Sequence, residues 1–175
     1  MRFTGLDLSL TSTGYSIDGD TGVIRTSAKG PERLHIVSSK ILELVTSNSI
    51  DAVIIEGYSF ASRNSQAHSI GELGGAVRMR LWESGIPFVD VPPTCRAKFA
   101  TGKGNAGKTE VISSISAKTG LTFEGSGADD ECDAWILEQM GLTYVGESTQ
   151  YWSKEQLSAL EKVDWAEINR IREGQ

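Results

Sequence analysis

The residues that bind zinc and form disulfides are scarce in this sequence of 175 residues. It contains two cysteines, Cys95 and Cys132, and two histidines, His35 and His68. The cysteines form no C-x-x-C pair and no disulfide framework, so we expect reduced thiols in a cytosolic protein. Without a set of histidines and cysteines, no zinc site is predicted. We interpret both histidines as ordinary helix residues.

Long apolar runs are also missing. No run approaches the ~20 apolar residues that a membrane-spanning helix needs, and no internal repeat or low-complexity tract is visible. The first residues lead directly into a predicted strand and not into a basic leader with an apolar segment, so nothing suggests secretion. Length and ordinary apolar content predict a globular protein with a sizeable core.

Charge is unevenly placed along the chain. The net charge of −6 argues weakly against a nucleic-acid-binding protein. However, residues 63–118 carry eight basic and four acidic residues, whereas residues 121–175 carry 12 acidic and four basic ones. Local potential guides a polyanion more than total charge does. The middle of the chain is therefore where we expect a phosphate backbone to bind.

Hydrophobic periodicity predicts strands first and then alternating strands and helices. The expected strands cover residues 2–9, 13–18, 22–27, 52–56 and 86–91, and the expected helices cover residues 31–48, 66–82, 94–100, 108–118 and 129–140. The first three strands form a meander. We therefore predict a mixed α/β sheet, an antiparallel three-strand meander plus parallel strands, with helices on both faces.

Residues 141–175 differ in composition from the predicted first domain, residues 1–140. They carry Trp152 and Trp165, and Ser153 to Gln156 has the pattern of a helix capping box. We expect a helical C-terminal tail that packs on the first domain or extends from it.

Four carboxylates stand at the ends of predicted elements. Asp7 ends a strand before a tight turn, and Glu56 ends the apolar strand AVIIE. Asp130 and Asp133 begin a helix three residues apart, so they share one helix face. Acids are costly to bury without partners, and hard divalent cations prefer carboxylate oxygens. The four acids therefore predict a site for Mg²⁺, or for Mn²⁺ as a substitute.

Four segments carry a resemblance to a known family. They are GLDLSLTSTGYSI, VIIEGYSFASRNSQAHSIGELGGAVRMRL, PFVDVPPTCRAKFATGKGNAGKTEV and GADDECDAWIL, and they run from residue 3 to about residue 137. In order and spacing they resemble the RuvC-type Holliday junction resolvases of the RNase H-like nuclease superfamily. The later segment WSKEQLSALEKVDW looks like the tail of phage-encoded relatives. The resemblance implies an RNase H-like fold and cleavage of four-way DNA junctions that leaves 5′-phosphate and 3′-hydroxyl ends.

The same resemblance implies the roles of the site residues. Asp7, Glu56, Asp130 and Asp133 would be the catalytic metal ligands, with Asp7 bridging two ions. The neighbouring acids Asp129 and Glu131 would either have no role or support the ligands without binding the metal themselves. Lys108 would stabilise charge that develops on the phosphate. The residues expected to contact DNA are Lys98, Lys103, Lys108, Arg63, Asn64 and two aromatic candidates for stacking on unpaired bases, Tyr58 and Phe60.

A homodimer is expected because a four-way junction has two-fold symmetry and two related nicks need two active sites. The predicted helix 66–82 is our candidate interface. Gly71, Gly74 and Gly75 would let a second helix approach closely, or would instead allow tight packing against the protein's own sheet. The sequence leaves open whether a branch-migration motor cooperates.

Several alternatives stay open at this point. The acids at 129–133 also suit a helix N-terminus that is stabilised by the helix dipole, and the lysines and aromatics also suit a solvated loop and core packing. The pattern G-x-D-x-S-x-T-x-x-G at residues 5–14 also resembles the phosphate-binding turn of sugar kinases and actin-like ATPases, which are much longer. Other functions consistent with the acids are a broader flap, branched-DNA or RNase H-type nuclease, and a non-catalytic junction-binding protein.

Overall fold

A five-stranded mixed sheet forms the centre of the protein in the computed structural model, which describes residues 1–58 and 66–174. The strand order is β3-β2-β1-β4-β5. β1, β2 and β3 pair antiparallel, and β1, β4 and β5 pair parallel. The strand bounds are Phe3–Asp7, Ser12–Ile17, Asp20–Arg25, Ala52–Glu56 and Phe88–Val91. The predicted meander and the parallel strands are both confirmed.

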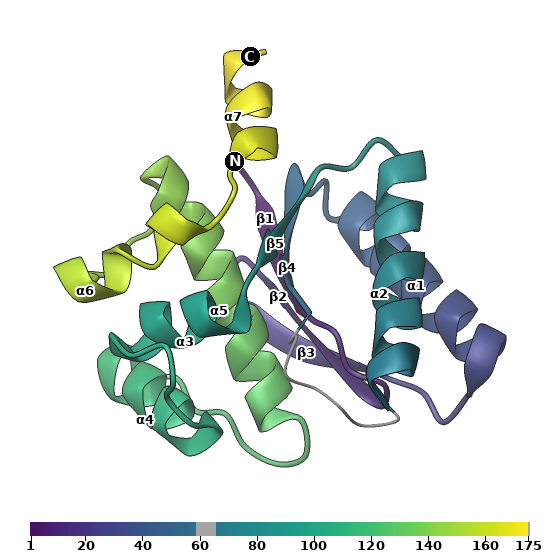
Figure 1. Cartoon of the computed structure of the whole chain (residues 1–175), viewed down its shortest axis with the longest axis horizontal. Helices are drawn as coiled ribbons and strands as arrows, with labels where there is room; N and C mark the ends of the chain where they lie inside the picture. The colour runs from purple at the N-terminus through teal and green to yellow at the C-terminus, as the bar shows by residue number, and fades with distance from the viewer. Residues whose placement is uncertain (59–65, 175) are drawn as a thin grey trace.

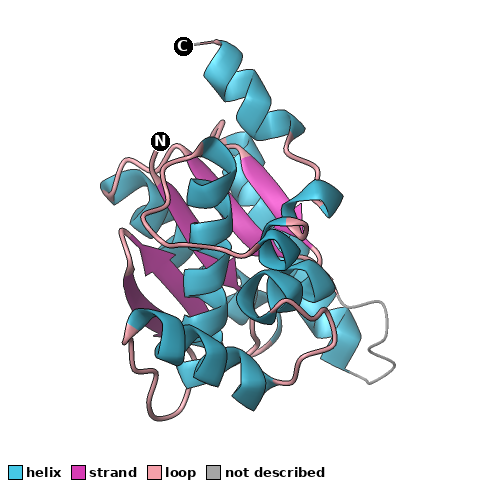
Figure 2. Cartoon of the chain, turned by 90° about the vertical axis from the view of Figure 1, so that its left-hand side faces the viewer, coloured by secondary structure: helices cyan, strands magenta, loops and turns pink. Residues whose placement is uncertain are grey.

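Helices cover both faces of this sheet, as Figure 1 shows. One layer holds α1 (Gly30–Ser47) and α2 (Gln66–Glu83). The other layer is built on α5 (Ala128–Val145), which packs against β1 and β2. Turned by 90°, Figure 2 shows α5 and its neighbours in front of the sheet. α3 (Pro93–Thr101) and α4 (Lys108–Thr119) contact α5. Beyond them, α6 (Lys154–Leu157) and the 3₁₀ turn η1 (Leu160–Lys162) contact α3, and α7 (Ala166–Glu173) contacts β5.

The apolar strand β4 explains why two cores exist. Its side chains alternate between the faces of the sheet. Ala52 and Ile54 join the core under α3, α4 and α5, whereas Val53 and Ile55 join the core under α1 and α2. All four are fully buried. A strand covered on both faces reads as a continuous apolar run, which is what the sequence AVIIE shows.

Two glycines let α5 lie unusually close to the sheet. A Cβ on Gly5 of β1 would overlap the backbone of Ala134 and lie 2.7 Å from the backbone nitrogen of Glu138. A Cβ on Gly14 of β2 would overlap the carbonyl of Asp130. The first turns of α5 are thereby held directly over β1 and β2.

α5 continues five residues past Met140, where the predicted helix ends. Position 141 lies inside this helix and is occupied by glycine. A Cβ there would lie 3.1 Å from Phe3 and 3.0 Å from Ile54, so a larger residue would press on both. The helix ends at Gly146, whose φ of 81° is the left-handed conformation common after a helix C-terminus.

The tail after α5 packs back onto the core. The rings of Trp152 and Phe99 lie 4.1 Å apart, and those of Trp165 and Tyr144 stack at 4.3 Å. The predicted capping box is confirmed, because Ser153 and Gln156 cap the start of α6 reciprocally. No helix in residues 1–58 and 66–174 is long and apolar enough to cross a bilayer.

The glycines of α2 do not all lie on one open face. Added Cβ atoms on Gly71 and Gly75 would meet nothing within 4 Å, so both face open space. The expectation that Gly74 shares this face is wrong: Gly74 is buried, and its Cβ would clash with Tyr58 and Arg78. The reason is helical geometry, since Gly71 and Gly75 are four residues apart on one side, whereas Gly74 is turned toward the protein.

Candidate active site

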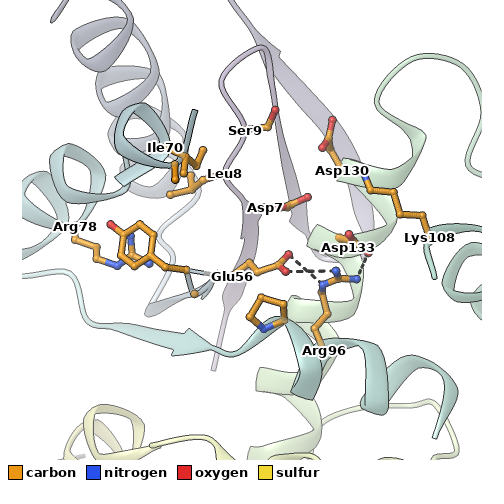
Figure 3. Close-up of a pocket in the computed structure, with 14 residues that line it drawn as sticks. Asp7, Leu8, Ser9, Glu56, Ile70, Arg78, Arg96, Lys108, Asp130 and Asp133 are labelled. Carbon is orange, nitrogen blue, oxygen red and sulfur yellow. Dashed lines mark hydrogen bonds and ion pairs between the residues drawn. The ribbon is translucent and has the colours of Figure 1, made fainter. Parts of the chain in front are cut away.

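Three carboxylates converge at one edge of the sheet. Asp7 ends β1 and Glu56 ends β4, and these strands are parallel neighbours in which Leu6 pairs with Ile55. Asp133 reaches the same point from α5. One oxygen from each carboxylate lies within 4.8 Å of the other two. Figure 3 shows Asp7 between Asp130 and Glu56, with Asp133 beside it. Three of the four acids singled out in the sequence therefore meet.

Asp130 lies one helical turn before Asp133 and lines the same cavity, which has a volume of about 370 Å³. It is not one of the three acids that approach within 4.8 Å among the described residues. Its two neighbours on α5 point elsewhere: Asp129 forms an ion pair with Lys108, and Glu131 accepts a hydrogen bond of 2.7 Å from Thr21.

Burial raises the pKa values of three of the acids, Asp7, Asp130 and Asp133. The pKa of Asp7 lies well above its usual value, first because the carboxyl is desolvated and then because Glu56 and Asp133 add negative charge. Burial raises the pKa of Asp133 to about 7, although Arg96 acts in the opposite direction. Burial also raises the pKa of Asp130. Ionising all of these clustered carboxyl groups at once is unfavourable in the protein alone. A bound cation would neutralise their charge, so the site favours cation binding.

One basic residue that the sequence analysis did not single out lies inside this acidic cavity. Arg96 on α3 forms an ion pair with Glu56, with Nε 3.1 Å from Oε2, and a second one with Asp133 through Nη1. Nη2 also donates to Glu56 Oε1 at 3.4 Å. Only 13% of the Arg96 side chain is exposed. Burial lowers the pKa of this guanidinium, but Glu56 and Asp133 outweigh that effect and raise it.

The three predicted lysines differ in position. Lys108 begins α4, lines the cavity and pairs with Asp129, which raises the pKa of Lys108 and lowers that of Asp129. Lys103 pairs with Glu110 at 3.2 Å outside the cavity. Lys98 does not line the cavity. Two residues along a helix correspond to about half a turn, so Lys98 and Arg96 point to different sides of α3.

Tyr58 also lines the cavity and is 42% exposed. Its hydroxyl donates to the carbonyl of Gly71 at 3.2 Å and accepts from Arg78 at 3.1 Å. The Arg78 guanidinium lies 4.7 Å from the Tyr58 ring centre and is also paired with Asp90. The other residues predicted after Glu56 lie outside the described part of the chain: Phe60, Arg63 and Asn64.

The donor set of the cavity fits a hard divalent cation. Asp7, Glu56 and Asp133 offer carboxylate oxygens at a spacing that one ion can span, and Asp130 adds a fourth carboxylate nearby. Mg²⁺, Mn²⁺ and Ca²⁺ prefer such oxygens. Two of the acids come from rigid strands and two from one turn of α5, so the arrangement is fixed by the fold.

Comparison with known proteins agrees with this geometry. The family described as "Crossover junction endodeoxyribonuclease RuvC" matches residues 3–135. The RuvC protein of Synechococcus sp. (strain WH7803) is 28% identical over 152 residues, which are 81% of this chain and 97% of that protein. A RuvC protein of Thermus thermophilus is 27% identical over 135 residues, 69% of this chain and 81% of that protein.

Solved structures show the same fold. The T. thermophilus RuvC structure superposes with a TM-score of 0.66 at 23% identity, covering 86% of this chain and all of that one. T. thermophilus RuvC in complex with a Holliday junction substrate gives a TM-score of 0.67 at 23% identity over 86% of this chain and 99% of that one. The match over residues 3–135, which include all four cavity acids, shows that this chain belongs to the RuvC family of crossover junction endodeoxyribonucleases.

Proposed function

We propose that this protein is a Mg²⁺-dependent endonuclease that resolves four-way DNA junctions by two symmetric nicks, leaving 5′-phosphate and 3′-hydroxyl ends. The observation that carries this proposal is the convergence of Asp7, Glu56 and Asp133 in one cavity of a RuvC-family chain. The Holliday junction bound to a relative of the same fold supports the choice of substrate.

The carboxylates of the cavity supply what phosphodiester hydrolysis requires. Two bound metal ions would generate a hydroxide nucleophile and stabilise the attacking and leaving oxygens. Asp7 is our candidate for the ligand that both ions would share. Glu56 and Asp133 would each bind one of the ions, and Asp130 would be a further ligand beside them. Lys108 stands at the edge of the cavity, where its ammonium group can offset charge that develops on the phosphate.

DNA contacts outside the cavity fall to the basic and aromatic residues around it. We assign Lys98 and Lys103 to the phosphate backbone, which positions a duplex without reading its sequence. Tyr58 is our candidate for stacking on an unpaired base, because its ring is partly exposed at the cavity. Such stacking contributes about 1–3 kcal/mol per base. Phe60, Arg63 and Asn64 remain proposed contacts of the same kind.

We infer that the active form is a homodimer that joins through the outer face of α2. This face consists of Gly71, Gly75, Met79 and Trp82. The two glycines face open space, and Met79 and Trp82 are 54% and 76% exposed. A second copy of the helix can approach closely at the glycines while the two large side chains pack against it.

The two buried, free cysteines are consistent with a cytosolic location.

The experiment is a cleavage assay on a synthetic four-way junction that cannot branch-migrate. Each strand is labelled in turn, Mg²⁺ is titrated, and both nicks are mapped. We expect nicks at symmetry-related positions, dependent on Mg²⁺, with ends that a ligase can seal. Equal or faster cleavage of a flap or of an RNA–DNA hybrid would instead support the broader nuclease. Tight binding without cleavage at any Mg²⁺ concentration would support a binding protein.

A further inference from the structure

The guanidinium of Arg96 lies where the carboxylates of the cavity could bind a metal ion. It lies between Glu56 and Asp133, and these are two of the three acids whose oxygens come within 4.8 Å of one another. Figure 3 shows this group on the cavity side of α3, linked to both carboxylates. The same carboxylate oxygens cannot serve fully as ligands of an ion and as acceptors of this guanidinium.

The burial of the contact shows that Arg96 is more than a surface ion pair. The side chains of Arg96, Glu56 and Asp133 are 13%, 14% and 9% exposed. Two carboxylates held this close in a poorly hydrated site repel each other strongly unless a positive charge lies between them. Arg96 supplies that charge. Its backbone is anchored by the buried face of α3, which consists of Cys95, Ala97, Phe99 and Ala100.

We propose that Arg96 is the resident counter-ion of the metal site: it holds Glu56 and Asp133 together in the metal-free protein, the divalent ion displaces it, and the released guanidinium binds the scissile phosphate. Arginine suits the last step because its planar fork binds phosphate oxygens in pairs. Lys108 lines the same cavity from α4 and is paired with Asp129, so the two bases approach the phosphate from different elements.

Displacement and a purely structural role predict opposite changes in metal affinity when Arg96 is replaced. If Arg96 competes with the metal, removing its charge strengthens metal binding, because the ligands regain an uncompensated negative potential. If Arg96 only shapes the pocket, removing it disorders the ligands and weakens metal binding. The sign of the change therefore separates the two roles.

The test is Mn²⁺ binding by the full chain without DNA, followed by the EPR signal of free Mn²⁺ or by calorimetry. Arg96→Met is compared with the wild type and with Arg170→Met, which removes an exposed arginine that is paired with Glu167 on α7. We expect Arg96→Met to bind Mn²⁺ about tenfold more tightly than the wild type does. A tenfold change corresponds to only part of the energy of one charge–charge interaction near a protein surface. Arg170→Met should bind Mn²⁺ as the wild type does. Unchanged or weaker binding by Arg96→Met would overturn the proposal.

A second variant keeps the test decisive if Arg96→Met folds poorly without metal. Arg96→Lys retains the charge, but a single ammonium cannot form the same set of contacts with both carboxylates. We expect its Mn²⁺ affinity to lie between those of the wild type and Arg96→Met. A Lys variant that binds Mn²⁺ more weakly than the wild type does would contradict the displacement.

The phosphate step rests on the proposed function and has its own readout. At saturating Mn²⁺, single-turnover cleavage of a four-way junction should be slower in Arg96→Met than in the wild type, although its metal affinity is higher. An undiminished rate would remove the phosphate contact from the proposal and leave the counter-ion role. If the wild type cleaves no junction, the proposed function fails, while the Mn²⁺ measurements on the free protein still decide the metal competition.

Discussion

Gly14 of β2 lies directly against the backbone carbonyl of Asp130 on α5, with no space between them for a methyl group. This contact fixes how closely α5 approaches the sheet, and α5 carries Asp130 and Asp133. The distance from the strand-borne Asp7 to its helix-borne partners therefore depends on a residue with no side chain.

We predict that Gly14→Ala destabilises the protein by about 1–3 kcal/mol, the usual scale of overpacking, and slows cleavage because α5 must shift. Urea unfolding and junction cleavage at saturating Mg²⁺ measure the two effects. The control is Glu43→Ala, at an exposed position of α1, where the change in stability should lie within about 0.5 kcal/mol. Unaltered stability of Gly14→Ala would contradict the close packing.

Lys108→Ala should lower the single-turnover rate roughly 10²–10³-fold, the scale observed when one group that stabilises developing charge is removed, with a smaller effect on junction affinity. Binding and single-turnover cleavage are measured separately. Lys40→Ala, which removes an exposed lysine on α1, should change neither. A loss of affinity with an intact rate would make Lys108 a positioning contact.

The outer face of α2 should control dimerisation. Gly75→Arg and Met79→Lys place a charge on this face without touching either core, because Gly75 faces open space and Met79 is exposed. We expect folded monomers that bind junctions more weakly and produce single, uncoupled nicks. Analytical ultracentrifugation at micromolar concentration measures the oligomeric state.

Leu157→Lys, on the exposed part of α6, is the control for this surface and should leave the oligomer unchanged. Wild-type protein that sediments as a monomer, or mutants that remain dimers, would reject the interface.

The titration of the Glu138 carboxyl group should make the stability of the protein depend on pH. Glu138 is buried on α5, where Ser16 and the backbone N–H of Gly19 donate to its carboxylate. Burial outweighs these bonds and raises the pKa of Glu138 above its ordinary value. The folded state then retains the proton longer than the unfolded state, so this group's contribution to stability falls as pH rises from the unfolded pKa through the folded one.

Glu138→Gln removes that titration. Its stability relative to the wild type should therefore increase as the pH rises from about 4, near the ordinary carboxyl pKa, into the neutral range. Urea unfolding of both proteins across this range provides the comparison. A constant difference would show that Glu138 titrates alike in both states.

The order of strands and helices could be predicted because each element has its own local signal. AVIIE reads as a strand covered on both faces, and the Ser153–Gln156 capping box marks the start of α6. The strand ends at Asp7 and Glu56 then bring two acids together, because neighbouring parallel strands end at the same edge of a sheet. Local patterns of this kind do not depend on long-range packing.

Other features depend on tertiary contacts that no local pattern encodes. Gly141 resembles a helix end, but Phe3 and Ile54 lie against it, so α5 continues. Gly74 resembles Gly71 and Gly75 in the sequence, but it is covered by side chains that come from other turns and elements. Arg96 is one of several basic residues in the central segment. Its signal is visible in hindsight, since helical spacing from Pro93 places it on the face of α3 that lines the cavity.

Asp7→Asn tests whether Asp7, Glu56 and Asp133 form the metal centre of a junction-cleaving nuclease. This substitution keeps the size of the side chain and removes the charge at the centre of the cluster. Cleavage and binding of the same labelled four-way junction are measured in Mg²⁺ for the wild type and the variant. We expect cleavage by Asp7→Asn to be lost while the folded variant binds the junction at least as tightly, because less negative charge faces the phosphates. Retained cleavage at the wild-type rate by a folded Asp7→Asn protein would show that these acids are not the metal centre.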